Sequence, residues 1–338
     1  MRLFFFILLI ELIVGFILPA KAQQEPLAGE LKSAIQHEAF TVNALVQAGL
    51  RYSLNKDDFQ GGRTFEVPNA RLDFKGILDN RFYYRIFFNM AKEPNILDAL
   101  AGYRHSEALK ITVGMMKPRQ TRDYIPDPGS TDFIDRTVIT GLLVQSREIG
   151  IAFDGNMGAV NYYGGMYNGN NKLTNNNNKF YYIGRLQYSF ENLFPGILKL
   201  AVQGSTGDSP GVQSGNAGPV LRGKRAIYGT DFKWETNRLL LAAEYLAGEL
   251  ETQILPNEKE TISGYYVTGG FRFLKQTKAL VRWQSWGYKK QDVLENQFTF
   301  GINHNFTSLT SFQFNFDAYL PEQSDKKYGL SCIWQIQF

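Results

Sequence analysis

The feature of this sequence that most restricts its fold is an alternation of apolar and polar residues at a period of two. It begins at Phe40 and recurs up to Phe338, for example over residues 82–90, 182–190 and 328–338. Such a period is typical of a β-strand with one apolar and one polar face. The alternating segments run for about 10–12 residues, which is the length a tilted strand needs to cross a bilayer. Strands of a soluble sandwich are usually only about 5–6 residues long.

Composition excludes several other classes of protein. The 338 residues carry a net charge of +4 and a single cysteine, and the mean hydropathy is −0.25. A slightly polar average excludes a bundle of membrane helices, and one cysteine excludes a disulfide framework or a Cys-based zinc site. The charge is too small to indicate nucleic-acid binding, so no nucleic acid is expected as a partner.

The N-terminus predicts export. Met1-Arg2 is followed by an apolar stretch, Leu3 to Leu18, that is interrupted only by Glu11, and Ala20-Lys21-Ala22 fits a small-x-small cleavage site. We therefore expect a signal peptide at residues 1–22, a short periplasmic segment at 23–38 and one β domain at 39–338. An uncleaved anchor is the alternative, although the apolar stretch is short for a span of roughly 20 residues.

Two architectures could use long alternating strands. A sandwich buries its apolar faces, whereas a membrane barrel turns them toward lipid and keeps a polar lumen. Here the polar faces contain Arg, Lys, Gln and Asn at mid-strand, and aromatic residues lie near the strand ends, as in the aromatic girdles of outer-membrane barrels. The fold expected is a transmembrane antiparallel up-and-down β-barrel in the bacterial outer membrane.

The connections predict about sixteen strands. Short links alternate with longer ones, and in bacterial barrels short turns face the periplasm while long loops face outward. Thr206–Arg222 is among the long loops expected. The least certain strand is Ile96–Arg104, because residues 95–100 could instead open a short helix, which would reduce the count to fourteen or change the register.

Strand parity places more basic than acidic residues on the lumen side. A positive lumen would concentrate anions, but paired Arg and Asp or Glu side chains could equally brace the wall, and parity leaves both interpretations open. The basic residues are Arg51, Arg71, Lys75, Arg81, Arg85, Lys110, Arg185, Lys199, Arg225, Lys233 and Arg282, and the acidic residues are Asp73, Glu148, Asp231, Glu235, Glu244 and Asp317.

The longest connection, Lys117–Ser146, predicts the constriction of the channel. It combines four basic residues with four aspartates and contains apolar residues, such as Phe133 and Leu142, that would be costly on a solvated tip. If the loop folds into the barrel, its apolar residues pack on the wall and its charges line the opening. An ordinary packed external loop is the alternative.

Three segments around this loop resemble the phosphate-selective porin O and P family. Residues 109–118 (LKITVGMMKP) are similar to its K-x-x-V-G-x-x-K-P strand end, and 131–136 (TDFIDR) and 146–151 (SREIGI) are similar to the segments that follow. The resemblance implies a trimeric, 16-stranded channel with an inward-folded third loop and basic residues at its constriction. Lys117, Arg119 and Arg136 fall in matching segments. The four aspartates of the loop depart from a purely basic constriction.

The residues expected to line the constriction and contact solutes are Lys117, Arg119, Arg122, Arg136, Arg81 and Arg85. The function expected is passive diffusion of small hydrophilic solutes with a weak preference for anions, phosphate among them, without a cofactor or metal. The partners expected are outer-membrane lipid, two further copies in a homotrimer, and the barrel-assembly machinery, which would recognise the C-terminal Phe338. No motif of a hydrolase or metalloenzyme occurs, so an enzyme is not expected. A closed barrel acting as a structural protein or adhesin through its external loops is the alternative function.

Overall fold

The computed structural model describes residues 36–55, 62–91, 95–144, 147–175, 177–191, 195–215, 217–254 and 258–338. The expected signal peptide (1–22) and most of the segment 23–38 lie outside these residues. Ser146, at the end of the longest loop, also lies outside them.

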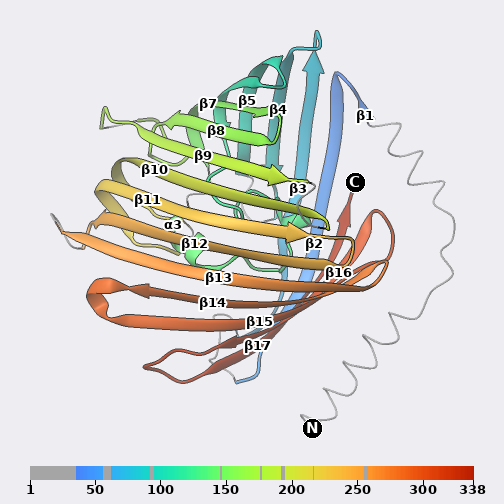
Figure 1. The fold of residues 1–338 in the computed structure, drawn as a ribbon, viewed down its shortest axis with the longest axis vertical. Helices are drawn as coiled ribbons and strands as arrows, with labels where there is room; N and C mark the ends of the chain where they lie inside the picture. The colour runs from blue at the N-terminus through green and yellow to red at the C-terminus, as the bar shows by residue number, and fades with distance from the viewer. Residues whose placement is uncertain are drawn as a thin grey trace.

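The described residues form one closed ring of sixteen antiparallel strands (Figure 1). Each strand pairs with the next along the chain, and β17 (Lys327–Gln337) pairs with β2 (Phe40–Ser53), which closes the ring. A two-residue strand, β1 (Gln36–His37), pairs with the start of β2. Closure gives the backbone groups of every strand a partner, as a lipid environment requires. The other strands are β3 (Arg63–Leu78), β4 (Phe82–Asn89), β5 (Asn95–Ser106), β6 (Leu109–Met116), β7 (Glu148–Met157), β8 (Val160–Tyr167), β9 (Tyr181–Phe190), β10 (Ile197–Gln213), β11 (Val220–Glu235), β12 (Leu239–Thr252), β13 (Lys259–Leu274), β14 (Thr277–Tyr288), β15 (Val293–Asn305) and β16 (Thr310–Tyr319).

The uncertain segment after Asn95 is a strand and not a helix. Strand β5 pairs with β4 and β6 along its length, so the count is sixteen and the fourteen-stranded alternative is wrong.

The prediction of a long loop at Thr206–Arg222 was wrong in its bounds. Strand β10 continues to Gln213 and β11 begins at Val220, because polar residues go on pairing across the two strands, as Asp208 does with Lys224. Strands β10 to β13 are consequently longer than β6 to β8, which have 8 to 10 residues.

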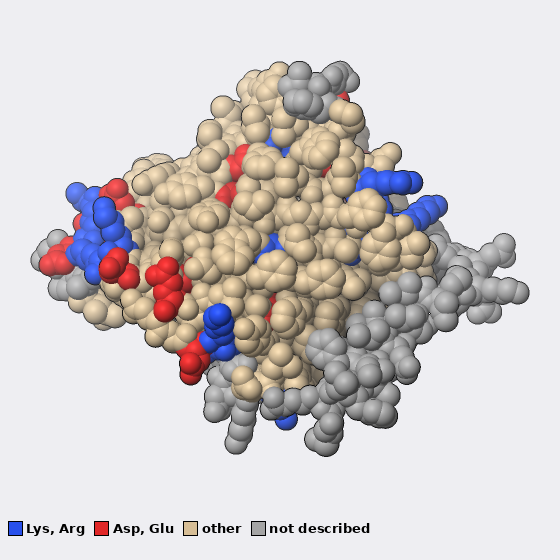
Figure 2. Space-filling view, turned by 60° about the horizontal axis from the view of Figure 1, so that its bottom comes forward, with Lys and Arg blue, Asp and Glu red and all other residues tan. Residues whose placement is uncertain are grey.

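The outer face of the ring is apolar. Large hydrophobic side chains from many strands are exposed on it, among them Val113, Phe153, Leu186, Val202 and Val267. Figure 2 shows a broad belt of uncharged atoms over one such face, with Lys, Arg, Asp and Glu gathered mainly toward its edges. An exposed apolar belt of this size is expected where a protein meets lipid or another protein.

The interior of the ring is occupied by the connection between β6 and β7. It contains a short 3-10 helix, η1 (Pro128–Ser130), and a helix of six residues, α3 (Val138–Leu143), and Figure 1 shows α3 within the ring. This confirms the inward-folded third loop. Among the described residues, no helix is long and apolar enough to cross a membrane.

Candidate functional site: a constricted lumen

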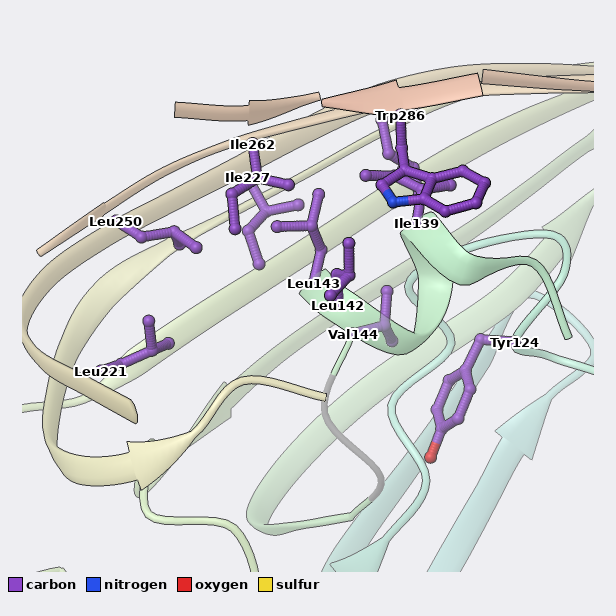
Figure 3. Close-up of a cluster of buried hydrophobic side chains, with 11 residues drawn as sticks. Tyr124, Ile139, Leu142, Leu143, Val144, Leu221, Ile227, Leu250, Ile262 and Trp286 are labelled. Carbon is purple, nitrogen blue, oxygen red and sulfur yellow. The ribbon is translucent and has the colours of Figure 1, made fainter. Parts of the chain in front are cut away.

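Helix α3 fixes the end of the interior loop to the lumen face of strands β11 to β14. Ile139, Leu142 and Leu143 are buried against a cluster of apolar wall residues (Figure 3). Burying a leucine side chain contributes roughly 1.5–3 kcal/mol relative to leaving it in water. The apolar residues that would be costly on an external loop are therefore packed. The wall residues of this cluster are Leu221, Ile227, Leu246, Leu250, Ile262 and Trp286.

Polar side chains of the wall hold the middle of the loop through its backbone. One amide donor from each of three neighbouring strands, β15, β16 and β17, reaches a loop carbonyl oxygen, and Arg282 of β14 donates to another. Each such bond contributes about 0.5–1.5 kcal/mol, and together they keep loop carbonyls paired in the barrel interior. The bonds are Gln335 Nε2 to Gly129 O (2.9 Å), Gln313 Nε2 to Thr131 O (2.9 Å), Asn303 Nδ2 to Asp132 O (2.8 Å) and Arg282 Nη1 to Asp135 O (3.1 Å).

Ion pairs add to these tethers. Lys278 Nζ lies 2.6 Å from Asp132 Oδ1, and Arg51 makes a bidentate contact with Asp135 at 2.6 and 2.9 Å. Arg51 also donates to Glu66 at 2.7 Å. Asp132 and Asp135 of the loop are thus each paired with a cation of the wall.

Glu244 of β12 binds the backbone of the first part of the loop. Its carboxylate accepts the backbone N–H groups of Arg122 (3.0 Å) and Asp123 (3.2 Å) and the hydroxyl of Tyr266 (2.9 Å). The guanidinium of Arg122 lies 5.3 Å from the centre of the Tyr266 ring. Arg122 therefore packs on the wall of β12 and β13.

Lys117 and Arg136 both turn toward the loop itself. Lys117 Nζ donates to the carbonyl oxygens of Ile125 (3.1 Å) and Pro126 (2.9 Å) and lies 3.4 Å from Asp127 Oδ1. Burial and the neighbouring Arg136 lower the pKa of Lys117 to about 7. Lys117 is therefore poised to change its charge near neutral pH.

Arg136 braces the loop. Its guanidinium donates to the carbonyl oxygens of Asp123 and Pro126 and lies 5.2 Å from the centre of the Tyr124 ring, over which Lys117 Nζ also lies at 4.7 Å. A guanidinium held by two carbonyl oxygens and a ring face fixes the shape of the turn between them.

Arg119 is the predicted loop cation most open to the lumen. Its side chain is 52% exposed, although Nη1 reaches Asp154 Oδ2 of β7 at 3.3 Å. Exposed ion pairs are weak, with a median near 0–1 kcal/mol. The pair with Asp154 therefore holds the Arg119 guanidinium only weakly.

Arg85 lies beneath the loop in a set of carboxylates. Its guanidinium donates to Asp73 (2.7 and 3.1 Å) and to Asp98 (2.9 Å), and Nη2 lies 3.6 Å from Asp127 Oδ2 of the loop. The structure brings Arg85 together with Lys117 through Asp127. The neighbouring cations hold the pKa of Asp127 below its usual value despite burial.

Arg81 does not join the others. It lies in the exposed turn before β4, where its guanidinium donates to the hydroxyl of Tyr103 at 3.3 Å. The structure thus brings five of the six predicted residues to the loop and its surroundings and places Arg81 at the end of the wall.

Several residues of this site were not predicted from the sequence. Arg147, just after the loop, is buried and donates to Asp98 at 3.1 Å, and Asp98 and Asp154 add two acids to the lumen. Strict alternation from Ile96 would put Asp98 on the lipid side. Strand β5, however, carries an extra residue, Leu97, opposite Phe87 and Phe88 of β4, and this bulge turns Asp98 inward. The alternation of β7 does place Asp154 inward and could have found it.

One side of the lumen is packed shut and the other is hollow. On the packed side, α3 fills the space in front of β11 to β14. At the boundary between the two sides, Arg225 of β11 pairs with Glu148 of β7 at 3.5 Å, and both side chains are fully buried. On the hollow side, a cavity of about 790 Å³ lies between loop residues 117–127 and the wall of β3 to β9. Seven basic residues (Lys75, Arg85, Arg104, Lys110, Lys117, Arg119 and Arg185) and four acidic ones (Glu38, Asp98, Asp127 and Asp154) line it.

These features define a class of protein: a β-barrel channel whose lumen is narrowed by an inward-folded third loop. Residues 40–292 match the model of the family described as phosphate-selective porin O and P. The chain belongs to this family, and it is a porin of the bacterial outer membrane.

Solved structures agree on the fold. An anion-selective porin from Comamonas acidovorans has a TM-score of 0.67 at 12% identity, with 89% of this chain and 99% of that chain covered. The in-vitro folded OmpT of Vibrio cholerae in its trimer form has 0.67 at 11% identity, covering 89% and 100%. The outer-membrane channel DcaP of Acinetobacter baumannii has 0.64 at 9% identity, covering 88% and 97%. No curated protein matches the sequence significantly.

Proposed function

We propose that this porin lets small hydrophilic solutes diffuse passively across the outer membrane with a weak preference for anions. The observation that carries the proposal is the hollow side of the lumen, where cations outnumber acids seven to four. A low-dielectric wall focuses the field of such an excess and raises the local concentration of anions. Because most of the cations have carboxylate neighbours, the preference is weak. Phosphate is a candidate anion, since the family is described by its selectivity for phosphate.

The constriction of the proposed path lies where Lys117, Arg119 and Asp127 of the loop face Arg85 of β4. Arg119 supplies the exposed charge. Arg122, which packs on the wall, and Arg136, which binds loop carbonyl oxygens, support the loop and do not line the path. We assign Arg81 to the mouth of the channel.

The assembly partners are part of the same proposal. A homotrimer is supported by the likeness to OmpT in its trimer form, and outer-membrane lipid suits the apolar belt. The C-terminal Phe338 lies at the seam of the ring, where its N–H donates to Ala44 O at 3.1 Å. We infer that the barrel-assembly machinery recognises Phe338, and its position beside the closing pair of strands supports this.

Planar bilayers test the proposal. The purified protein is expected to give discrete conductance steps and, in a KCl gradient, a reversal potential displaced toward the chloride equilibrium potential. Cation preference would contradict the anion assignment, and added phosphate measures whether that anion competes with chloride.

A closed structural or adhesin barrel is the second candidate, because the packed side of the lumen fills much of the interior. Conductance no greater than that of detergent blanks would favour it.

A further inference from the structure

One apolar side chain of the interior loop is left uncovered. Within residues 117–144, Ile125 is the exposed large hydrophobic residue, with 37% of its surface accessible, whereas Tyr124, Phe133, Ile139, Leu142 and Leu143 are buried. An apolar side chain that stays in contact with water does not gain the stabilisation that burial gives to its apolar neighbours. Ile125 lines the cavity on the hollow side of the lumen.

The wall of the same cavity carries further apolar surface. Leu100 and Tyr83 both line it and are partly exposed. The Tyr83 ring lies along the wall over Gly102, where a Cβ atom would overlap it, and its hydroxyl is tied to Thr112 Oγ1 at 2.5 Å. With its hydroxyl occupied at the wall, Tyr83 offers the cavity mainly its aromatic ring.

Cations lie on both sides of this apolar zone. Lys75 lies directly across from Arg85 on neighbouring strands, and Arg104 lies directly across from Lys110. Like charges in such positions destabilise a sheet. Arg104 and Lys110 share a single carboxylate, that of Glu107, at 3.8 Å each.

The spacing of these groups suits a solute with two chemical parts. Leu100 lies opposite Arg85 on β5, and Arg104 is four residues further along the same strand, or ~13 Å at the usual rise of a strand. A small organic ion can therefore place its anionic group beside Arg104 and Lys110 while its hydrocarbon part lies against Leu100, Tyr83 and Ile125.

We propose that the channel favours organic anions that carry an apolar chain or ring over equally sized anions that are polar throughout. The inference rests on the proposed function, since it requires an open path on the hollow side. It adds the substrate class: the basic residues select the charge, and Ile125 with its neighbours selects the hydrocarbon part.

Reversal potentials with hexanoate and gluconate test the inference. Both are six-carbon monocarboxylates, but only hexanoate has an apolar chain. Gluconate is also the larger ion because of its hydroxyl groups, so the apolar contribution is read from the change in the permeability ratio between wild type and variant. A protein-free bilayer corrects for leakage of the neutral acid. Removing one CH₂ from water changes an equilibrium roughly fourfold, so we expect a permeability ratio of hexanoate to gluconate of about 3 to 10 beyond that of a detergent-only blank. Ile125→Asn should lower the ratio roughly threefold or more, toward the value that the sizes of the two ions alone would set.

Ile254→Asn is the matched control, because Ile254 is 83% exposed in the connection after β12 and does not line the cavity. It should keep the wild-type ratio. Leu100→Asn, a change on the wall, should lower the ratio as Ile125→Asn does, which separates contact with the solute from a shift of the loop.

Equal permeability of the two anions through pores that conduct chloride would overturn the inference and leave the channel function intact. A hexanoate preference that persists in both Ile125→Asn and Leu100→Asn would also overturn it. Pores that conduct neither chloride nor either carboxylate would instead overturn the proposed function.

Discussion

The two sides of the lumen are built from the same kind of strand, but they contact the interior loop in different ways. On the side of β11 to β17, the interior loop is packed and tethered: α3 buries its leucines, and side chains of the wall hold loop carbonyls. On the side of β3 to β9, the loop meets the wall mainly through charged groups around a cavity. We infer that the first side supplies rigidity and that the second provides the passage. Because the loop is anchored to the first side, its distance from the opposite wall, and with it the width of the cavity, is fixed.

The largest effect is expected on the packed side. Leu143→Ala removes a fully buried side chain and should lower the free energy of unfolding by ~2–5 kcal/mol. Unfolding in denaturant, followed by tryptophan fluorescence, measures it. Leu173→Ala, at a residue 62% exposed in the connection after β8, should stay within about 0.5 kcal/mol of wild type. Equal effects would show that α3 is not an anchor.

On the hollow side, charge should matter more than stability. Arg119→Glu removes the exposed cation and leaves Asp154 without its partner, so we expect the ratio of chloride to potassium permeability to fall roughly twofold or more. Lys259→Glu, at the start of β13 where Lys259 pairs with Glu249 at 3.1 Å, should change the ratio little. A larger effect at Lys259 would argue against a path beside Arg119.

A smaller effect is expected from pH. Because the pKa of Lys117 lies at about 7, its ammonium is charged at pH 6 and largely neutral at pH 8.5. The pKa of Asp127 lies below its usual value, so its carboxylate stays charged over this range and the anion preference should decline as pH rises. Lys117→Met should remove the dependence. An anion preference that rises with pH in the wild type would contradict the role of Lys117.

The smallest effect is expected from a single tether. Gln335→Leu removes the bond to Gly129 O and should lower the free energy of unfolding by about 1 kcal/mol. Conductance should not change, because Gln313 and Asn303 hold the next part of the loop. A clear change in conductance would show that the tethers act one by one and not as a set.

Much of the fold could be predicted from the period of two, because that period fixes which face of a strand meets lipid. Parity placed Arg85, Arg185 and Arg225 on the lumen side, where they lie. Parity cannot report a bulge, so Asp98 was missed, and the basic excess of the lumen is smaller than the sequence predicted.

The roles of the loop residues were harder to predict than their location. The inward fold followed from the cost of exposing Phe133 and Leu142. Sequence alone could not show that Lys117 and Arg136 would bind loop carbonyls while Arg119 stayed exposed, since these roles depend on how the loop folds back on itself. Arg147 lies within the resembling segment 146–151, but its position there carried no signal for the ion pair with Asp98.

The central claim is that solutes pass on the hollow side of the lumen. Two matched variants test it in a Cys332→Ala background, since Cys332 is the single cysteine of the chain. Leu100→Cys places a thiol in the cavity, and Leu246→Cys places one in the buried cluster beside α3. A negatively charged, water-soluble thiosulfonate added during recording should reduce the current through Leu100→Cys pores and leave Leu246→Cys pores unchanged. Block of Leu246→Cys pores with no effect on Leu100→Cys pores would contradict the account.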